Sequence, residues 1–145
     1  MRGIIAFVPL ADKSQVRFRV RYAETDQMRV VYHANYLVWF EMARTELCRI
    51  RGVRYRDMER DDQIRLAVVD AHCRYHAPAL YDDEIISEGR IAEVNPRMLT
   101  FAYEIRNAET GRLLVTGETK HVFLDATGRP IRVPEKYRDL FGMDD

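Results

Sequence analysis

The chain contains one long apolar helix pattern, and this feature constrains its fold more than any other. In residues 35–51, large apolar side chains recur at spacings of three and four, at Tyr36, Trp39, Phe40, Ala43, Leu47 and Ile50. The stripe is widened to most of the helix circumference near its start by Leu37, Val38 and Met42. A helix of this kind is buried, so the rest of the chain has to cover it. We expect Asn35 to cap its beginning and Gly52 to end it.

The rest of the chain has the pattern of an antiparallel sheet. Strands are predicted at residues 16–22, 64–77, 84–94, 98–107 and 112–124, with turn signals between them. In the second of these strands, the alternation puts one set of residues on a common face, namely Ala67, Val69, Ala71, Cys73 and Tyr75. One helix cannot cover both faces of five strands, so the economical solution wraps the sheet around the helix. The outer face and the exposed edges are then left to water or to a partner chain.

Length and charge limit the class of protein. A chain of 145 residues predicts a single domain. The 23 lysines and arginines balance the 23 aspartates and glutamates, which argues against bulk electrostatic binding to nucleic acid. Cys48 and Cys73 match no metal or redox spacing and favour a reducing compartment. No stretch has the length of a membrane span or the pattern of a secretory signal, so we expect a soluble cytoplasmic protein without membrane insertion.

Several common kinds of site are missing from the sequence. Ser14 and Ser87 are the only serines, and neither lies in the G-x-S-x-G turn of a serine hydrolase. No glycine-rich phosphate loop is present. His72 and His76 lie in one predicted strand, where residues four apart are separated by about 13 Å. One ion cannot bridge that distance, so no metal site is expected.

Polar and ionisable residues gather instead between the first strand and the helix, from Tyr22 to Tyr36. This segment contains Glu24, Asp26 and His33 and runs directly into the beginning of the helix. Unpaired backbone N–H groups and the positive end of the helix dipole favour an anion there. A carboxylate beside such donors is what acyl transfer needs. The residues alone leave a structural alternative open, in which the two carboxylates cap the helix and His33 packs against it.

The segment RYAETDQMRVVYHANYLVWFEMARTE resembles the signature of the 4-hydroxybenzoyl-CoA thioesterase family, and within it the acyl-CoA thioesterases associated with the Tol–Pal system. HAPALYDDEI and GRPIRVP continue the resemblance, which covers roughly residues 15–136. It implies an α+β hotdog fold, in which a five-stranded curved antiparallel sheet wraps around one long helix. Residues 1–145 would form one domain, with an N-terminal extension at 1–14 and a core at 15–136. The resemblance also implies a homodimer and a further association of two dimers into a homotetramer.

The same resemblance implies hydrolysis of an acyl-CoA to the free acid and CoA, without a metal or redox cofactor. Asp26 falls on the family's catalytic carboxylate and would act as nucleophile or general base. His33 would supply an oxyanion donor through its backbone N–H and polar support through its side chain, and Tyr22 would orient the site. A hydratase or dehydratase of the same fold and a non-catalytic acyl-thioester-binding protein remain alternatives.

Arginine positions complete the expected site. Arg29 stands where the family usually has glycine, so the loop conformation is in question and the side chain could reach a CoA phosphate or a neighbouring carboxylate. Basic residues should also bind the CoA phosphates at the mouth of the site, and the candidates by family position are Arg97, Arg129 and Arg132. Glu41 and Arg44 lie one helical step apart and are expected to form a structural ion pair.

Overall fold

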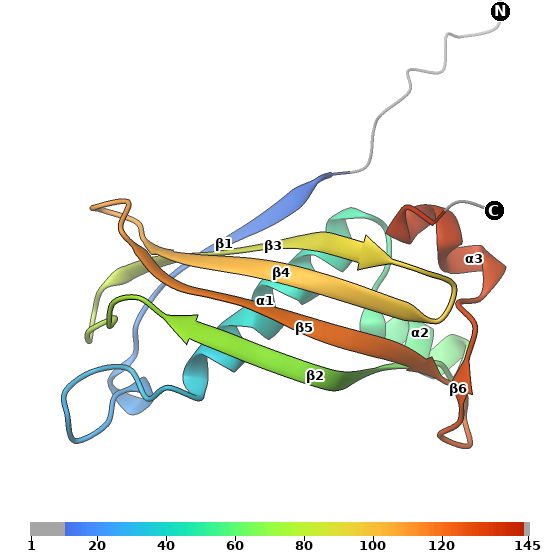
Figure 1. Ribbon diagram of the computed structural model, residues 1–145, viewed down its shortest axis with the longest axis horizontal. Coiled ribbons are helices and arrows are strands. Elements are labelled where there is room, and N and C mark those ends of the chain that lie inside the picture. The colour runs from blue at the N-terminus through green and yellow to red at the C-terminus, as the bar shows by residue number, and fades with distance from the viewer. Residues whose placement is uncertain (1–10, 144–145) are drawn as a thin grey trace, which may run out of the picture.

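The computed structural model describes residues 11–143 and shows a curved sheet wrapped around one long helix (Figure 1). The strands are β1 Lys13–Arg19, β2 Arg65–Tyr75, β3 Glu84–Val94, β4 Met98–Asn107, β5 Leu113–Leu124 and the two-residue β6 Pro130–Ile131. The helices are α1 Asn35–Ile50, α2 Tyr55–Asp61 and α3 Glu135–Arg138, with 3-10 turns at Tyr22–Glu24 and Asp139–Phe141. This is the α+β architecture predicted for the hotdog fold, with β6 as an addition.

The sheet has the strand order β1-β3-β4-β5-β2, and β6 pairs with β5. Every pairing between these strands is antiparallel. Because the order places β1 and β2 at the two ends, these two strands form the free edges of the sheet. The predicted strands 84–94 and 98–107 have the observed bounds of β3 and β4, and in the second of them regular alternation marks the sequence clearly.

Helix α1 lies on the concave side of the sheet and buries the predicted stripe. Trp39, Phe40, Ala43 and Leu47 have no exposed surface. Burying a side chain such as Phe40 or Leu47 stabilises the fold by roughly 1.5–3 kcal/mol. The helix approaches the sheet closely at Gly89, where an added Cβ would lie 3.2 Å from the Ala43 side chain.

The first strand begins earlier than predicted. It was expected at residues 16–22, but β1 runs from Lys13 to Arg19 and the chain then turns into a 3-10 helix. Ser14 is buried and donates a hydrogen bond of 2.6 Å to the Ala43 carbonyl on α1, which fixes the strand to the helix. The proposed division between an extension at 1–14 and a core therefore falls inside β1, and residues 1–10 of that extension lie outside the described residues.

Strand β2 departs from the predicted alternation. A β-bulge between Val68 and Asp70 takes up one residue. Ala71, Cys73 and Tyr75 therefore face the helix side of the sheet, while Ala67 lies opposite Val122 on the outer face. A bulge of this kind is a property of strand pairing and leaves no clear mark in the sequence.

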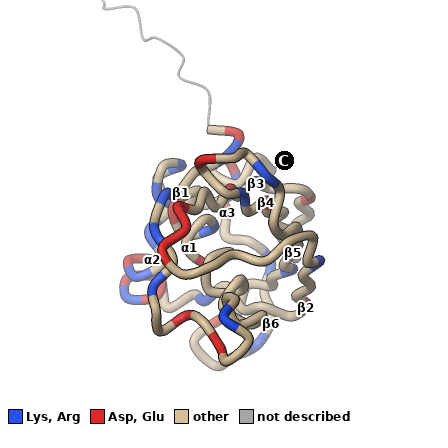
Figure 2. The backbone as a smooth tube through the Cα atoms, turned by 90° about the vertical axis from the view of Figure 1, so that its left-hand side faces the viewer, with Lys and Arg blue, Asp and Glu red and all other residues tan. Residues whose placement is uncertain are grey.

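The two edges of the sheet differ in character. Along β1 the exposed side chains are charged or polar, namely Lys13, Gln15, Arg17 and Arg19. Along β2, by contrast, apolar side chains remain exposed, with Val68 at 51%, Val69 at 54% and Tyr75 at 49%. Charged side chains discourage edge-to-edge pairing, whereas exposed apolar residues on an unpaired strand favour it. Figure 2 shows positive and negative residues interspersed over the backbone.

The ion pair expected between Glu41 and Arg44 is not formed. Arg44 is buried and donates a hydrogen bond of 3.0 Å to the Tyr103 hydroxyl, which lies 2.5 Å from Thr119 Oγ1. Thr119 in turn contacts His121 Nε2 at 2.7 Å. Burial lowers the pKa of His121 to about 3, so its imidazole is neutral in this core network. The prediction was wrong because Arg44 turns toward β4 and β5 rather than along its own helix.

Candidate active site

The loop between β1 and α1 is held in a compact shape by its own backbone. Thr25 and Val31 form an isolated bridge, and inside it the Asp26 N–H donates to the Val30 carbonyl at 2.9 Å. The Arg29 N–H donates back to the Asp26 carbonyl at 2.9 Å, and the Met28 N–H donates to Asp26 Oδ1 at 2.9 Å. One carboxylate oxygen of Asp26 is thus fixed by the loop itself.

Arg29 adopts a backbone conformation that favours glycine. Its φ is +67°, in the left-handed region. A non-glycine residue pays roughly 1–2 kcal/mol for that conformation. The sequence left open whether an arginine in place of the usual glycine changes the loop conformation. The backbone of the turn has a positive φ, which glycine would also permit, in spite of the arginine side chain. Arg29 is exposed.

Glu24 is a structural carboxylate. It is buried, and it accepts hydrogen bonds from Trp39 Nε1 at 2.7 Å and from the Arg21 N–H at 2.8 Å. Burial would raise the pKa of Glu24, but these bonds and the Arg21 guanidinium together outweigh it and lower the pKa. The Glu24 carbonyl also accepts from the Tyr32 N–H and from Asn35 Nδ2. Asn35 is therefore not the helix cap that was predicted, since Ala34 holds that position and Asn35 ties the helix to Glu24.

Asp26 and His33 line one cavity of about 300 Å³ beside the beginning of α1. The other lining residues are Met28, Val30, Val31, Tyr36, Tyr75, His76, Ala77 and Pro78. The wall is aromatic on one side, where the Tyr36 and Tyr75 rings meet edge to face with centroids 5.6 Å apart. The cavity thus combines one carboxylate with an apolar and aromatic surface, as ligand sites commonly do.

The beginning of α1 offers free hydrogen-bond donors at this cavity. The Asn35 N–H donates to the Tyr32 carbonyl and the Leu37 N–H to the Ala34 carbonyl. Across residues 11–143, no protein acceptor is found for the N–H groups of His33 and Tyr36, both of which belong to lining residues. Unpaired N–H groups at a helix N-terminus favour negative charge.

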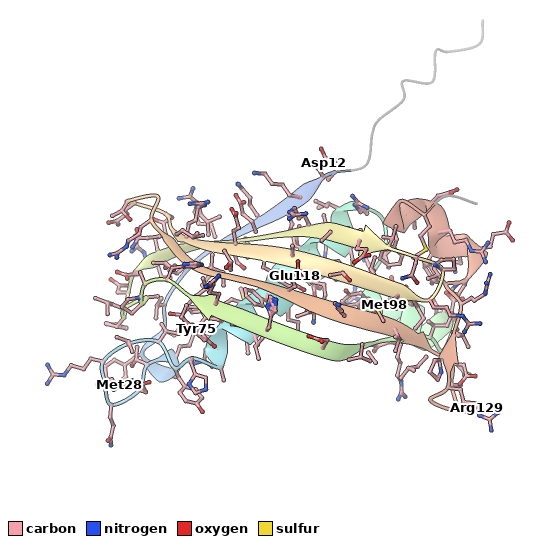
Figure 3. All side chains as sticks on the ribbon, viewed as in Figure 1. Asp12, Met28, Tyr75, Met98, Glu118 and Arg129 are labelled. Atoms are coloured by element: carbon pink, nitrogen blue, oxygen red, sulfur yellow. The ribbon has the colours of Figure 1, made fainter. Side chains whose placement is uncertain are left out.

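The structure separates the other predicted residues from this cavity. Tyr22 is 78% exposed, and its ring packs edge-on against Tyr81 outside the lining. Arg97 lies in the turn from β3 to β4, Arg129 in the turn from β5 to β6, and Arg132 directly after β6. Figure 3 shows Arg129 at one end of the molecule and Met28, on the Asp26 loop, at the opposite end. Within one chain these arginines therefore cannot reach the Asp26 cavity.

Among the lining residues that were not assigned to the site from the sequence are two polar ones from the end of β2, Tyr75 and His76. Tyr75 ends β2, and His76 follows it and lies 3.0 Å from Thr116 Oγ1. His76 had been weighed only as a metal ligand with His72. The segment from His76 to Pro78 carried a usable signal, because it belongs to HAPALYDDEI, one of the segments that resemble the family.

The fold and this site together define a hotdog thioesterase, and comparison with known proteins supports that class. The chain belongs to the thioesterase-like superfamily, whose family model matches residues 20–141. It is 36% identical over 127 residues to YneP of Bacillus subtilis (strain 168), provisionally named an acyl-CoA thioesterase, covering 87% of this chain and 91% of YneP. It is 30% identical to the acyl-CoA thioesterase YbgC of Haemophilus influenzae, with coverages of 85% and 90%.

A solved structure agrees with these relatives. The DHNA-CoA thioesterase of Staphylococcus aureus superposes with a TM-score of 0.82 at 34% identity, covering 88% of this chain and 85% of that one. The resemblance seen in the sequence is therefore confirmed for the family, while the Tol–Pal-associated branch stays a prediction. No helix within residues 11–143 has the length and apolarity needed to cross a bilayer.

Proposed function

We propose that this enzyme hydrolyses an acyl-CoA thioester to the free acid and CoA, with Asp26 as its catalytic carboxylate. One observation carries the proposal. The Asp26 side chain shares a cavity of about 300 Å³ with His33 and Tyr36, whose backbone N–H groups are unpaired at the start of α1. The named activities of YneP and YbgC support the choice of an acyl-CoA as substrate.

In this proposal the thioester carbonyl lies between the Asp26 carboxylate and the helix N-terminus. Asp26 either attacks the carbonyl carbon and expels the CoA thiolate, leaving a mixed anhydride that water then hydrolyses, or removes a proton from an attacking water. On both routes the carbonyl oxygen becomes negative. The His33 N–H stabilises that charge, with the helix dipole behind it. Water and a carboxylate suffice, so the proposal includes no metal or redox cofactor.

The side chains of His33 and Tyr22 have supporting roles in the proposal. The His33 ring packs against the Tyr32 ring, with centroids 4.5 Å apart, and forms part of the cavity wall. Tyr22 lies four residues before Asp26 and packs with Tyr81 on the exposed surface, where it would orient the substrate at the rim. A cytoplasmic location belongs to the same proposal, because CoA thioesters are made and used inside cells.

A homodimer formed through β2 would complete the site. β2 is the edge strand with exposed Val68, Val69 and Tyr75, so pairing with a second copy would cover apolar side chains and unpaired backbone groups together. We propose antiparallel pairing of the two β2 strands, which satisfies a twofold axis. Association of two such dimers into a tetramer is the corresponding proposal for the higher assembly.

Antiparallel pairing would also bring the distant arginines to the cavity. The start of β2 at Arg65 lies opposite Leu124, immediately before the turn that carries Arg129. The end of β2 at Tyr75 belongs to the Asp26 cavity. Two β2 strands paired in opposite directions place the start of one beside the end of the other. Arg129 of the partner subunit, with Arg97 and Arg132 near it, would then lie at the mouth and bind the CoA phosphates.

The test is a hydrolysis panel of short, long and aromatic acyl-CoAs, with acyl-carrier-protein thioesters beside them. We expect thiol release from at least one class at a rate far above the background. Hydration of an enoyl-CoA without thiol release would instead favour the hydratase alternative. An acyl-CoA that survives prolonged incubation with excess protein, while binding to it, would contradict the proposal and favour a binding protein.

A further inference from the structure

Tyr75 connects the free edge of the sheet to the beginning of α1. Its hydroxyl donates a hydrogen bond of 2.9 Å to the His33 carbonyl. The two residues are 42 positions apart in sequence, and both line the Asp26 cavity. Their rings also meet edge to face, with centroids 6.4 Å apart. This contact links the end of β2 directly to His33, which lies two residues before the first residue of α1.

Within the described part of the chain, the Tyr75 hydroxyl is the only hydrogen-bond donor to the His33 carbonyl. The helical pattern begins one residue later, since the Leu37 N–H donates to Ala34 and not to His33. Without the phenol, the carbonyl oxygen would have no protein partner in the wall of the cavity. An uncovered carbonyl presents the negative end of its dipole, and that end repels a nearby negative charge.

That carbonyl lies close to the point where negative charge would develop. Three covalent bonds separate the amide nitrogen and the carbonyl oxygen of one residue, so the His33 oxygen remains within a few ångströms of the His33 N–H. Two peptide groups flank the His33 Cα. The first is fixed because the Tyr32 carbonyl accepts from the Asn35 N–H, and the second is fixed by Tyr75.

We propose that Tyr75 is a positioning residue for thioester hydrolysis, which holds the His33 backbone and screens its carbonyl so that the His33 N–H can stabilise the oxyanion. This inference rests on the proposed function. Partial burial raises the pKa of Tyr75 to about 12, so the phenol keeps the proton that it donates. Tyr75 is the last residue of β2, the strand proposed to pair between subunits. A single hydrogen bond, from the Tyr75 hydroxyl to the His33 carbonyl, therefore connects that strand to the residue whose N–H is the oxyanion donor.

The test compares Tyr75→Phe with the wild-type enzyme and with Tyr81→Phe as a matched control. Tyr81 is a half-exposed phenol outside the cavity lining, and phenylalanine keeps the ring that packs against Tyr22, so its variant should behave as wild type. Tyr75→Phe loses the hydrogen bond to the His33 carbonyl, which matters most when the thioester carbonyl oxygen becomes negative. The kcat of this variant should therefore be about tenfold lower than that of the wild type. The affinity for a thioether analogue of acyl-CoA, which develops no oxyanion, should stay within about twofold, because ground-state binding does not use this bond.

The outcomes separate this inference from the proposed function. If the wild-type protein hydrolyses acyl-CoA and the kcat of Tyr75→Phe lies within about twofold of the wild-type value, the role of Tyr75 is overturned and the proposed function stands. An equal fall in kcat and in thioether affinity, or a large fall in the melting temperature, makes Tyr75 a merely structural residue and also overturns the inference. A wild-type protein that hydrolyses none of the thioesters overturns both proposals.

Discussion

The two ends of the curved sheet have different chemical characters. At one end the Asp26 loop, the beginning of α1 and the end of β2 enclose a carboxylate among aromatic rings. At the other end the turns after β3 and β5 carry Arg97 and Arg129, and Arg132 and Arg138 line a second cavity of about 350 Å³. One end thus resembles an acyl-transfer site and the other a phosphate-binding surface.

A CoA thioester has a reactive thioester at one end and phosphates at the other, so it needs both kinds of surface at once. Within one chain the two surfaces lie too far apart to be used together (Figure 3). Antiparallel pairing through β2 would bring the carboxylate end of one subunit to the arginine end of its partner. Under the proposed function, the comparison implies that each protomer would hold two half-sites, and that pairing along β2 would bring the half-sites of two subunits together.

Removing the carboxylate should have the largest effect. Asp26→Asn keeps the shape of the side chain and the acceptor for the Met28 N–H, so the fold should be preserved. Without the nucleophile or base, kcat should fall on the order of a thousandfold or more, with thioether affinity nearly unchanged. Steady-state kinetics and circular dichroism check this, with Glu109→Gln in the exposed turn between β4 and β5 as control. Near-normal hydrolysis would remove Asp26 from the mechanism.

Preventing subunit pairing should have the next largest effect. Val68→Lys places a charge on the apolar edge and should shift the protein toward monomers. Activity should fall on the order of a hundredfold, because the arginine end of the partner is lost. Sedimentation velocity measures the shift from dimer to monomer, and steady-state kinetics measures the loss of activity. Gln15→Lys on the opposite edge is the control and should leave both unchanged, and a fully active Val68→Lys monomer would contradict the two-ended site.

The arginine end should govern affinity rather than turnover. Arg129→Ala combined with Arg132→Ala should raise KM for acyl-CoA roughly tenfold with little change in kcat, because phosphate contacts are the same in the ground and transition states. The effect should vanish with an acyl-pantetheine, which lacks the nucleotide phosphates. An unchanged KM, or an equal effect on both substrates, would exclude these residues from CoA binding.

Glu24 provides a contrast with Asp26 two residues away. Glu24→Gln should destabilise the protein by about 2 kcal/mol through weaker bonds to Trp39 and Arg21, with much less loss of kcat than Asp26→Asn. Because the pKa of Glu24 is lowered in the folded state, its contribution is present above the ordinary pKa of 4.5 and is lost as pH falls through the folded value. Urea titrations at neutral and acidic pH should show a smaller difference between variant and wild type in acid.

The smallest effect is expected at Arg29. Arg29→Gly should relieve the strain of a left-handed conformation and raise the free energy of unfolding by about 1 kcal/mol or less, since glycine also gains freedom in the unfolded chain. Urea titration measures this change. A destabilised Arg29→Gly variant would show that the arginine side chain makes a contact that outweighs the strain.

Local patterns in the sequence predicted much of this structure. The apolar stripe located α1, regular alternation marked β4, and the turn signals on either side helped to give β3 and β4 their observed bounds. The Asp26 loop was located because the polar residues there adjoin the helix start. In each case the signal lies within a few neighbouring residues, where backbone period and burial are directly linked.

Features that depend on distant parts of the chain were not predicted. The bulge at Val69 arises from the pairing of β2 with β5, and Arg44 has its partner on β4 rather than on its own helix. Tyr75 reaches His33 across 42 positions, so its place in the cavity follows only from the fold. The separation of Arg129 from Asp26 is likewise a property of sheet topology and has no local signature.

Hybrid dimers test the two-ended site most directly. Two tagged chains, one with Asp26→Asn and the other with Arg129→Ala and Arg132→Ala, can be coexpressed and the mixed dimer purified by both tags. If each site takes its acid from one subunit and its arginines from the other, one of the two sites is intact. The hybrid should then show about half of the wild-type rate at low substrate, far above either parent variant. A rate no higher than the mean of the two parent variants would contradict the account.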